Sequence, residues 1–124
     1  MNKEKMLQIT KELLTFKGRI HRTRFWIVFL ITATIGQILL IGFAGLVNVA
    51  AVVSALLAIL IGTLVFWIIL SNFIRRFHDQ NKKGWHVLFG LIPVAGPIYI
   101  IILCGVIKGT EGDNEYGKDP LCQS

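Results

Sequence analysis

The sequence predicts an all-α integral membrane protein with three transmembrane helices, preceded by a short amphipathic helix at the membrane interface. Hydrophobic residues make up 54% of the 124 residues and charged residues only 16%. The 50 residues from Phe25 to Ile74 contain no Lys, Arg, Asp or Glu. As helix they would extend about 75 Å, enough to cross a ~30 Å bilayer core twice. A second apolar block runs from Trp85 to Ile107, and we treat residues 1–124 as one membrane domain.

The net charge of +6 is unevenly distributed along the chain. Seven of the 13 Lys and Arg residues precede Phe25, four lie between Arg75 and Lys83, and two follow Ile107. Because positively charged flanks stay in the cytoplasm, we expect a cytoplasmic N-terminus and a cytoplasmic central loop. Cations that flank membrane segments set orientation and attract anionic headgroups, so we expect no nucleic acid as partner.

Residues 3–17 predict the amphipathic helix. Met6, Ile9, Leu13 and Phe16 recur at helical spacing on one face, while the Lys and Glu residues of the segment lie elsewhere. Such a helix lies in the cytoplasmic headgroup layer. The alternative is an ordinary surface helix that packs on the rest of the protein.

Residues 25–44 and 49–71 predict the first two spans, with a turn between them. Small residues recur every four positions on the second span. In lipid this spacing lets two helix backbones approach closely, which predicts a helix-packing face. Its partner is either the first span or a second copy of the chain, which would make a homo-oligomer. The residues of this face are Ala50, Ser54, Ala58 and Gly62.

Residues 72–84 predict a basic cytoplasmic loop, and residues 85–107 a third span. Pro93 and Pro97 flank Gly96 within this span, and a proline removes a backbone donor and kinks a helix. We favour a kinked full crossing, because 23 residues match one crossing. The alternative is a re-entrant hairpin that returns to the same side. Under the favoured topology the polar tail, residues 108–124, lies outside the cytoplasm.

Three motifs in this order resemble the YhaH/YhaI-like family of small bacterial inner-membrane proteins, the domain-of-unknown-function family numbered 805. The N-terminal motif comprises Phe16, Gly18, Arg19, Arg22, Phe25 and Trp26. The central motif comprises Arg75, Arg76, His78, Asp79, Gly84 and Trp85. The tail motif comprises Gly109, Gly112, Asn114, Tyr116, Gly117, Asp119 and Pro120. The resemblance implies a multi-pass protein of the bacterial inner membrane and brings no established activity.

The central motif is the sharpest candidate site. If the second helix continues through it, Arg75 and Asp79 share a face, and an ion pair between them either fixes the loop or helps to hold a phosphate or carboxylate. His78 beside Asp79 suggests proton transfer, but no nucleophile accompanies them. The candidate residues for lipid or partner binding are Arg19, Arg22, Arg24, Arg75, Arg76, His78, Asp79 and Trp85. The candidate residues of the tail are Asn114, Tyr116, Gly117, Asp119 and Pro120.

These observations favour a non-enzymatic protein, oligomeric or an adaptor, whose basic cytoplasmic face contacts anionic lipid headgroups or an unknown protein partner. One alternative is a component of a small-solute transporter or channel, suggested by Gln37 and the proline break. The other is a headgroup-acting enzyme that uses His78 and Asp79. The histidine and cysteine spacings match no metal site, and we expect neither a metal nor a cofactor.

Overall fold

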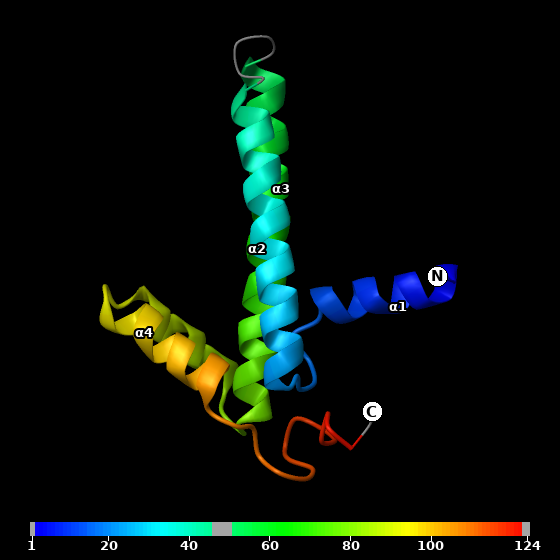
Figure 1. Cartoon of the computed structure of the whole chain (residues 1–124), viewed down its shortest axis with the longest axis vertical. Coiled ribbons are helices and arrows are strands. Elements are labelled where there is room, and N and C mark those ends of the chain that lie inside the picture. Colours follow the sequence, from blue (N-terminus) through cyan, green and yellow to red (C-terminus); the bar gives the residue numbers. More distant parts are fainter. Residues whose placement is uncertain (1, 46–50, 123–124) are drawn as a thin grey trace.

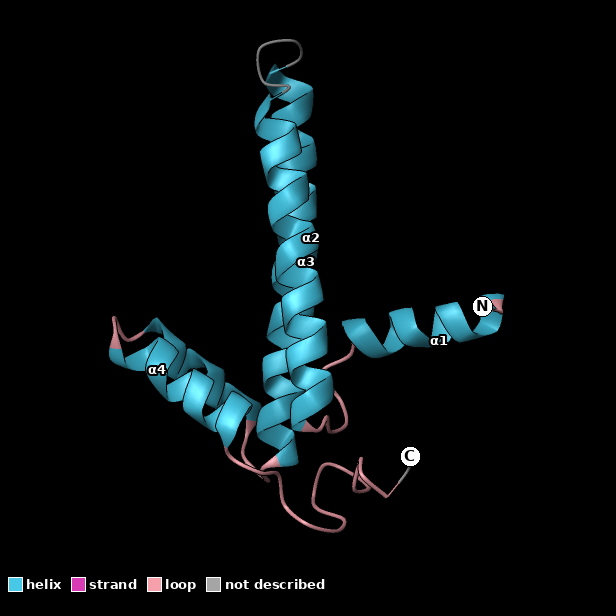
Figure 2. Cartoon of the chain, viewed as in Figure 1, coloured by secondary structure: helices cyan, strands magenta, loops and turns pink. Residues whose placement is uncertain are grey.

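The computed structural model describes residues 2–45 and 51–122. Its helical elements are α1 (Lys3–Leu14), α2 (Arg22–Gly45), α3 (Ala51–Asp79), the 3₁₀ helix η1 (Gly84–Leu91), α4 (Ala95–Ile101) and the π-helical turn η2 (Ile102–Val106). Figure 2 shows no β-strand in the described chain. The all-α prediction is therefore confirmed.

The helices α2 and α3 form a long hairpin (Figure 1). Both are long and apolar enough to cross a membrane. They pack closely at Gly36, where an added Cβ would lie 3.1 Å from both methyl carbons of Val65. Most of their other large apolar side chains are exposed, which suits a lipid solvent. The helix α2 covers the predicted span 25–44 with wider bounds, and α3 covers the predicted span 49–71 from Ala51 onward and continues beyond its end. Residues 46–50, including Ala50, lie outside the described residues.

The helix α3 extends eight residues past its predicted end, so eight of the 13 residues of the predicted loop 72–84 are helical. It ends where Asn81 adopts a left-handed φ of 56°, a conformation that Asn tolerates after a helix C-terminus. The amide of Lys82 donates to the carbonyl of Phe77, 2.9 Å away. This extension places Arg75, Arg76 and Asp79 on a rigid helix end rather than on a loop.

The helix α1 projects sideways from the hairpin, and only its C-terminal end is docked (Figure 1). Side chains of α3 satisfy three carbonyls at this end, which a helix leaves without internal partners. The carbonyls of Glu12, Leu13 and Leu14 accept hydrogen bonds from Arg75 (2.6 Å), Ser71 (2.6 Å) and Trp67 (3.2 Å), respectively. The helix ends three residues before the predicted boundary. Its interfacial role remains a prediction.

Residues 85–107 differ from the favoured prediction of one kinked helix. The chain reverses at Ile92–Val94, so η1 and α4 form a short helical hairpin (Figure 2). Pro97 falls in the first turn of α4, where its missing amide costs no internal hydrogen bond. Gly96 makes the reversal possible, because an added Cβ would overlap the backbone of Phe89 and Gly90. The prolines and glycines therefore build a turn rather than a kink.

The compact core lies at the base of the α2/α3 hairpin, where all these elements meet. It contains one cluster of buried apolar side chains from the segment before α2, from α2, from α3 and from the α4/η2 helix. The cluster comprises Ile20, Phe25, Phe77, Ile100, Leu103 and Cys104. A buried Asn72 amide also joins the two long helices by donating to the carbonyl of Phe25, 3.1 Å away.

Candidate functional site

Asp79, the last residue of α3, receives two guanidinium groups. Arg19 Nε donates to its Oδ1 at 3.1 Å, and Arg76 Nη1 donates to its Oδ2. All three side chains are at least 95% buried. Charge-assisted hydrogen bonds are the strong ones, and burial raises the cost of losing either partner. The observed helical ion pair joins Arg76 to Asp79, whereas the sequence analysis paired Arg75 with Asp79.

Arg19 binds the tail to the body of the protein. Its Nη2 donates to the carbonyl of Thr110 at 2.6 Å, and its Nη1 donates to the carbonyls of Gly112 (2.6 Å) and Gly117 (3.2 Å). Thr110 in turn donates its amide to the carbonyl of Asp79, 2.8 Å away. One arginine before α2 therefore joins the N-terminal motif to the tail motif through the end of α3.

Arg76 binds the short η1/α4 hairpin to the body of the protein, as Arg19 binds the tail. It is fully buried, and its Nε and Nη2 donate to the carbonyls of Cys104 (2.8 Å) and Ile107 (2.5 Å). The neighbouring carbonyls of Leu103, Gly105 and Val106 accept hydrogen bonds from the side chains of Gln80, Trp26 and Arg22, respectively. The five consecutive carbonyls of residues 103–107 are thus satisfied by side chains of α2, of α3 and of Gln80 just after α3, as a helix terminus requires.

His78 and Asn114 fix the middle of the tail. The imidazole of His78 stacks on the ring of Tyr116 with centroids 4.0 Å apart, and Asn114 Nδ2 donates to the His78 carbonyl at 2.9 Å. Both carboxylate oxygens of Asp79 are already taken by arginines. His78 therefore serves as a stacking platform in this arrangement, and Asp79 as an ionic anchor.

Asp119 folds the tail on itself. Its Oδ2 accepts the amide of Gly112 at 2.9 Å, and its Oδ1 accepts the amide of Leu121 at 2.9 Å. The Leu121 amide is the main cause that holds the pKa of the Asp119 carboxyl below its ordinary value, followed by the Gly112 amide. The tail residues predicted from the sequence thus form a compact loop. Gly117 lies in its turn with a φ of 134°.

The structure places the remaining predicted residues outside this network. Arg24 pairs with Glu12, and Arg75 donates to the Glu12 carbonyl. Trp85 is 53% exposed, with its ring centroid 4.6 Å from that of His86. On the predicted packing face Ser54 is buried, but nothing lies within 4 Å of a Cβ added at Gly62. The oligomeric role of that face remains a prediction.

Gly109 and Gln80 belong to the network although neither was a candidate binding residue. A Cβ at Gly109 would overlap the Asp79 carboxylate, so only glycine lets the tail pass this close. The resemblance of the tail motif already pointed to Gly109. Nothing in the sequence singles out Gln80, because its role depends on the position of Leu103.

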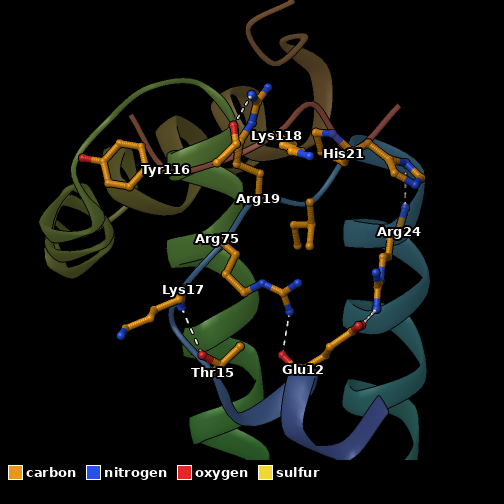
Figure 3. Close-up of a pocket in the computed structure, with 13 residues that line it drawn as sticks. Glu12, Thr15, Lys17, Arg19, His21, Arg24, Arg75, Tyr116 and Lys118 are labelled. Carbon is orange, nitrogen blue, oxygen red and sulfur yellow. Dashed lines mark hydrogen bonds and ion pairs between the residues drawn. The ribbon is translucent and has the colours of Figure 1, made fainter. Parts of the chain in front are cut away.

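The site has a cavity beside it. A cavity of about 460 Å³ lies between the C-terminal end of α1, the segment before α2 and the tail (Figure 3). In residues 2–45 and 51–122 no group of three His, Cys, Asp or Glu side chains is placed to hold a metal ion. The residues that line the cavity include Lys17, Arg24, Arg75 and Lys118, so its walls are rich in positive charge.

Comparison with known proteins identifies similar chains of the bacterial inner membrane. A family model described as "Protein of unknown function (DUF805)" matches residues 13–118. The chain is 31% identical to the inner membrane protein YhaI of Escherichia coli K12, over 92% of both chains. It is 32% identical to the inner membrane protein YhaH of the same strain, over 92% of this chain and 93% of the relative. No solved structure matches it.

Proposed function

The chain belongs to the DUF805 family of proteins of unknown function, and on that premise we propose a non-enzymatic platform of the bacterial inner membrane. Its basic cytoplasmic face binds anionic lipid headgroups. The observation that carries this proposal is that some cations are buried and bonded within the protein while others are exposed to their surroundings. Arg19 and Arg76 are buried and bonded within the protein, whereas a larger set of cations is exposed at the base and along α1. The exposed cations are Lys3, Lys5, Lys11, Lys17, Arg22, Lys83, Lys108 and Lys118.

The apolar surface supports a membrane-bound platform with two kinds of anchor. The α2/α3 hairpin has the length and composition to cross the bilayer. The α1 helix and the η1/α4 hairpin extend from its base in different directions (Figure 1). Both expose large apolar side chains, including Leu7 (58%), Leu91 (80%) and Val94 (77%). We propose that α1 lies in the headgroup layer and that the η1/α4 hairpin enters one leaflet and returns.

This topology puts the N-terminus and the tail on the cytoplasmic side. The bonds from Arg19 to the tail support it, since they require both segments on one side of the membrane. Cys122 is exposed and Cys104 is buried, so a Cys104→Ser chain offers one reporter thiol. A membrane-impermeant thiol reagent should label Cys122 in opened vesicles and not in intact cells. Labelling in intact cells would contradict the proposed topology.

The lipid contact is tested separately with spin-labelled lipids. The full-length protein in phosphatidylcholine membranes should immobilise a phosphatidylglycerol probe in preference to a phosphatidylcholine probe. Replacing Lys3, Lys5 and Lys11 of α1 with Gln should reduce the preference, because each surface cation contributes about 1 kcal/mol of attraction to an anionic surface. Salt should reduce it as well. Equal immobilisation of both probes by the unaltered protein would refute the proposal.

The non-enzymatic part of the proposal is supported by the state of the His78–Asp79 pair. A general base must reach the proton that it removes, and a carboxylate partner must orient it. Arg19 and Arg76 occupy both oxygens of Asp79, while His78 stacks on Tyr116. These contacts give His78 and Asp79 a structural role, which accounts for a histidine beside an aspartate without any catalysed reaction.

A further inference from the structure

We propose that the 460 Å³ cavity at the base of the hairpin binds one phosphate group of a small organic molecule, either a lipid headgroup or a soluble phosphoester. The proposal rests on the membrane platform proposed above and assigns it a discrete site. Four parts of the chain form the cavity walls: the end of α1, the segment leading into α2, α3 at Arg75 and the tail at residues 116–120. Figure 3 shows Lys17, Arg24 and Arg75 around this space.

The charge of the lining favours an anion. Lys17, Arg24, Arg75 and Lys118 line the cavity, together with Arg19 and His21. Glu12 is the single carboxylate among the lining residues, and it is paired with Arg24. Arg19 is already neutralised by Asp79. The residues that line the cavity therefore carry an excess of positive charge.

Arg75 supplies an independent indication of a missing acceptor. Its side chain lines the cavity and the residue is only 7% exposed. Its Nη1 donates to the Glu12 carbonyl at 2.6 Å, but its buried Nε has no hydrogen-bond partner among the described residues. A buried donor without an acceptor is costly, and a guanidinium fork matches the oxygens of a phosphate. A bound phosphate would offset the charge of this buried guanidinium.

The size and position of the cavity point to an organic phosphate rather than to a bare ion. Its volume falls within the range of about 300–1,000 Å³ typical of small-molecule sites. A phosphate with an attached glycerol fits such a space and leaves an acyl chain free to follow the apolar helices. The cavity also adjoins the end of α1, which we place at headgroup depth.

The test compares two double variants that remove equal charge. Lys17→Gln with Lys118→Gln removes two exposed lysines of the cavity wall, and Lys3→Gln with Lys5→Gln removes two exposed lysines at the far end of α1. The full-length protein in a neutral detergent is titrated calorimetrically. The ligands are a short-chain phosphatidylglycerol, glycerol phosphate and a short-chain phosphatidylcholine.

We expect saturable binding of one phosphatidylglycerol or one glycerol phosphate and a much weaker response to phosphatidylcholine, whose choline cation opposes the positive lining. Two lost charge-assisted hydrogen bonds should weaken binding about tenfold or more in the Lys17/Lys118 variant. The Lys3/Lys5 variant should stay within about threefold. Binding of glycerol phosphate as tight as that of the lipid identifies a soluble ligand. Binding of the lipid alone identifies a headgroup.

Equal weakening in both double variants, or no saturable binding at all, would overturn the cavity site. The general attraction to anionic membranes would survive either result, because the spin-label experiment with the Lys3, Lys5 and Lys11 substitutions decides it separately.

Arg75→Lys gives a second variant that keeps the charge and removes the guanidinium fork. It should weaken binding about tenfold. An unchanged thermal unfolding midpoint would show that α1 remains docked through Ser71 and Trp67. Unaltered affinity in this variant would also contradict the proposal.

Discussion

The long apolar part of the α2/α3 hairpin and its base are stabilised in opposite ways. Along most of its length the hairpin exposes apolar side chains and packs through contacts such as Gly36 with Val65. At its base, buried arginines reach across the fold to backbone carbonyls and to Asp79. In lipid the apolar surface gains nothing by being buried in protein, so polar bonds and close fit decide the structure. The base should therefore be far more sensitive to single substitutions.

The largest effect is expected for Arg76→Gln. It removes a fully buried cation that holds Asp79 and the carbonyls of Cys104 and Ile107. Breaking a buried ion pair costs about 3–5 kcal/mol. The thermal unfolding midpoint in detergent should fall sharply. Arg22→Gln is the matched control, because the exposed Arg22 makes one hydrogen bond, to the carbonyl of Val106. Equal losses in the two variants would remove the distinction between buried and exposed arginines.

Gly109→Ala should have the next largest effect. The added methyl group would overlap the Asp79 carboxylate and push the tail from its place. Overpacking of this kind costs about 1–3 kcal/mol. Limited proteolysis after Lys118 should become faster as the tail is released. Gly42→Ala controls for the change of residue, since nothing lies within 4 Å of its added Cβ. Rapid cleavage of both variants would point to a different cause.

A smaller effect is expected from substitutions in the long apolar part of the α2/α3 hairpin. Gly62→Ala should stabilise a monomeric hairpin by up to about 1 kcal/mol, because its added Cβ meets nothing and alanine favours helix. Gly36→Ala should gain little or nothing, since Val65 must yield to the new methyl group. Unfolding in detergent measures both. A loss of self-association in Gly62→Ala, seen by cross-linking, would instead support the predicted oligomer face.

The smallest effect is expected from the titration of Asp119. Two backbone amides lower the pKa of its carboxyl in the folded state, and Leu121 contributes most. Its contribution to tail docking is therefore fully present above the ordinary value of 3.8 and is lost as the pH falls through the lowered value. Exchange protection of the Gly112 amide should decrease in that range. Asp119→Asn should remove this dependence, and an unchanged pH profile would contradict the assignment.

Several features of the fold could be predicted from the residues alone. Fifty residues without a charged side chain predict two long apolar helices, because only a membrane solvates such a surface. The order of three motifs identified the family. The cations were correctly assigned to the segments that flank these helices. The sequence could not separate the arginines that are buried from those that stay exposed, since Arg19 and Arg22 are equally basic.

Only the tertiary structure shows that residues 85–107 turn back as a helical hairpin and that the three motifs contact one another. Two prolines around a glycine allow either a kink or a reversal, and 23 apolar residues suit either one crossing or two short arms. The close approach of Gly96 to Gly90 permits the reversal locally. Contacts distant in sequence then hold it, because Arg76 binds the carbonyls of Cys104 and Ile107 that follow the second arm. The sequence thus determined which segments are apolar, whereas long-range hydrogen bonds determined where the chain returns.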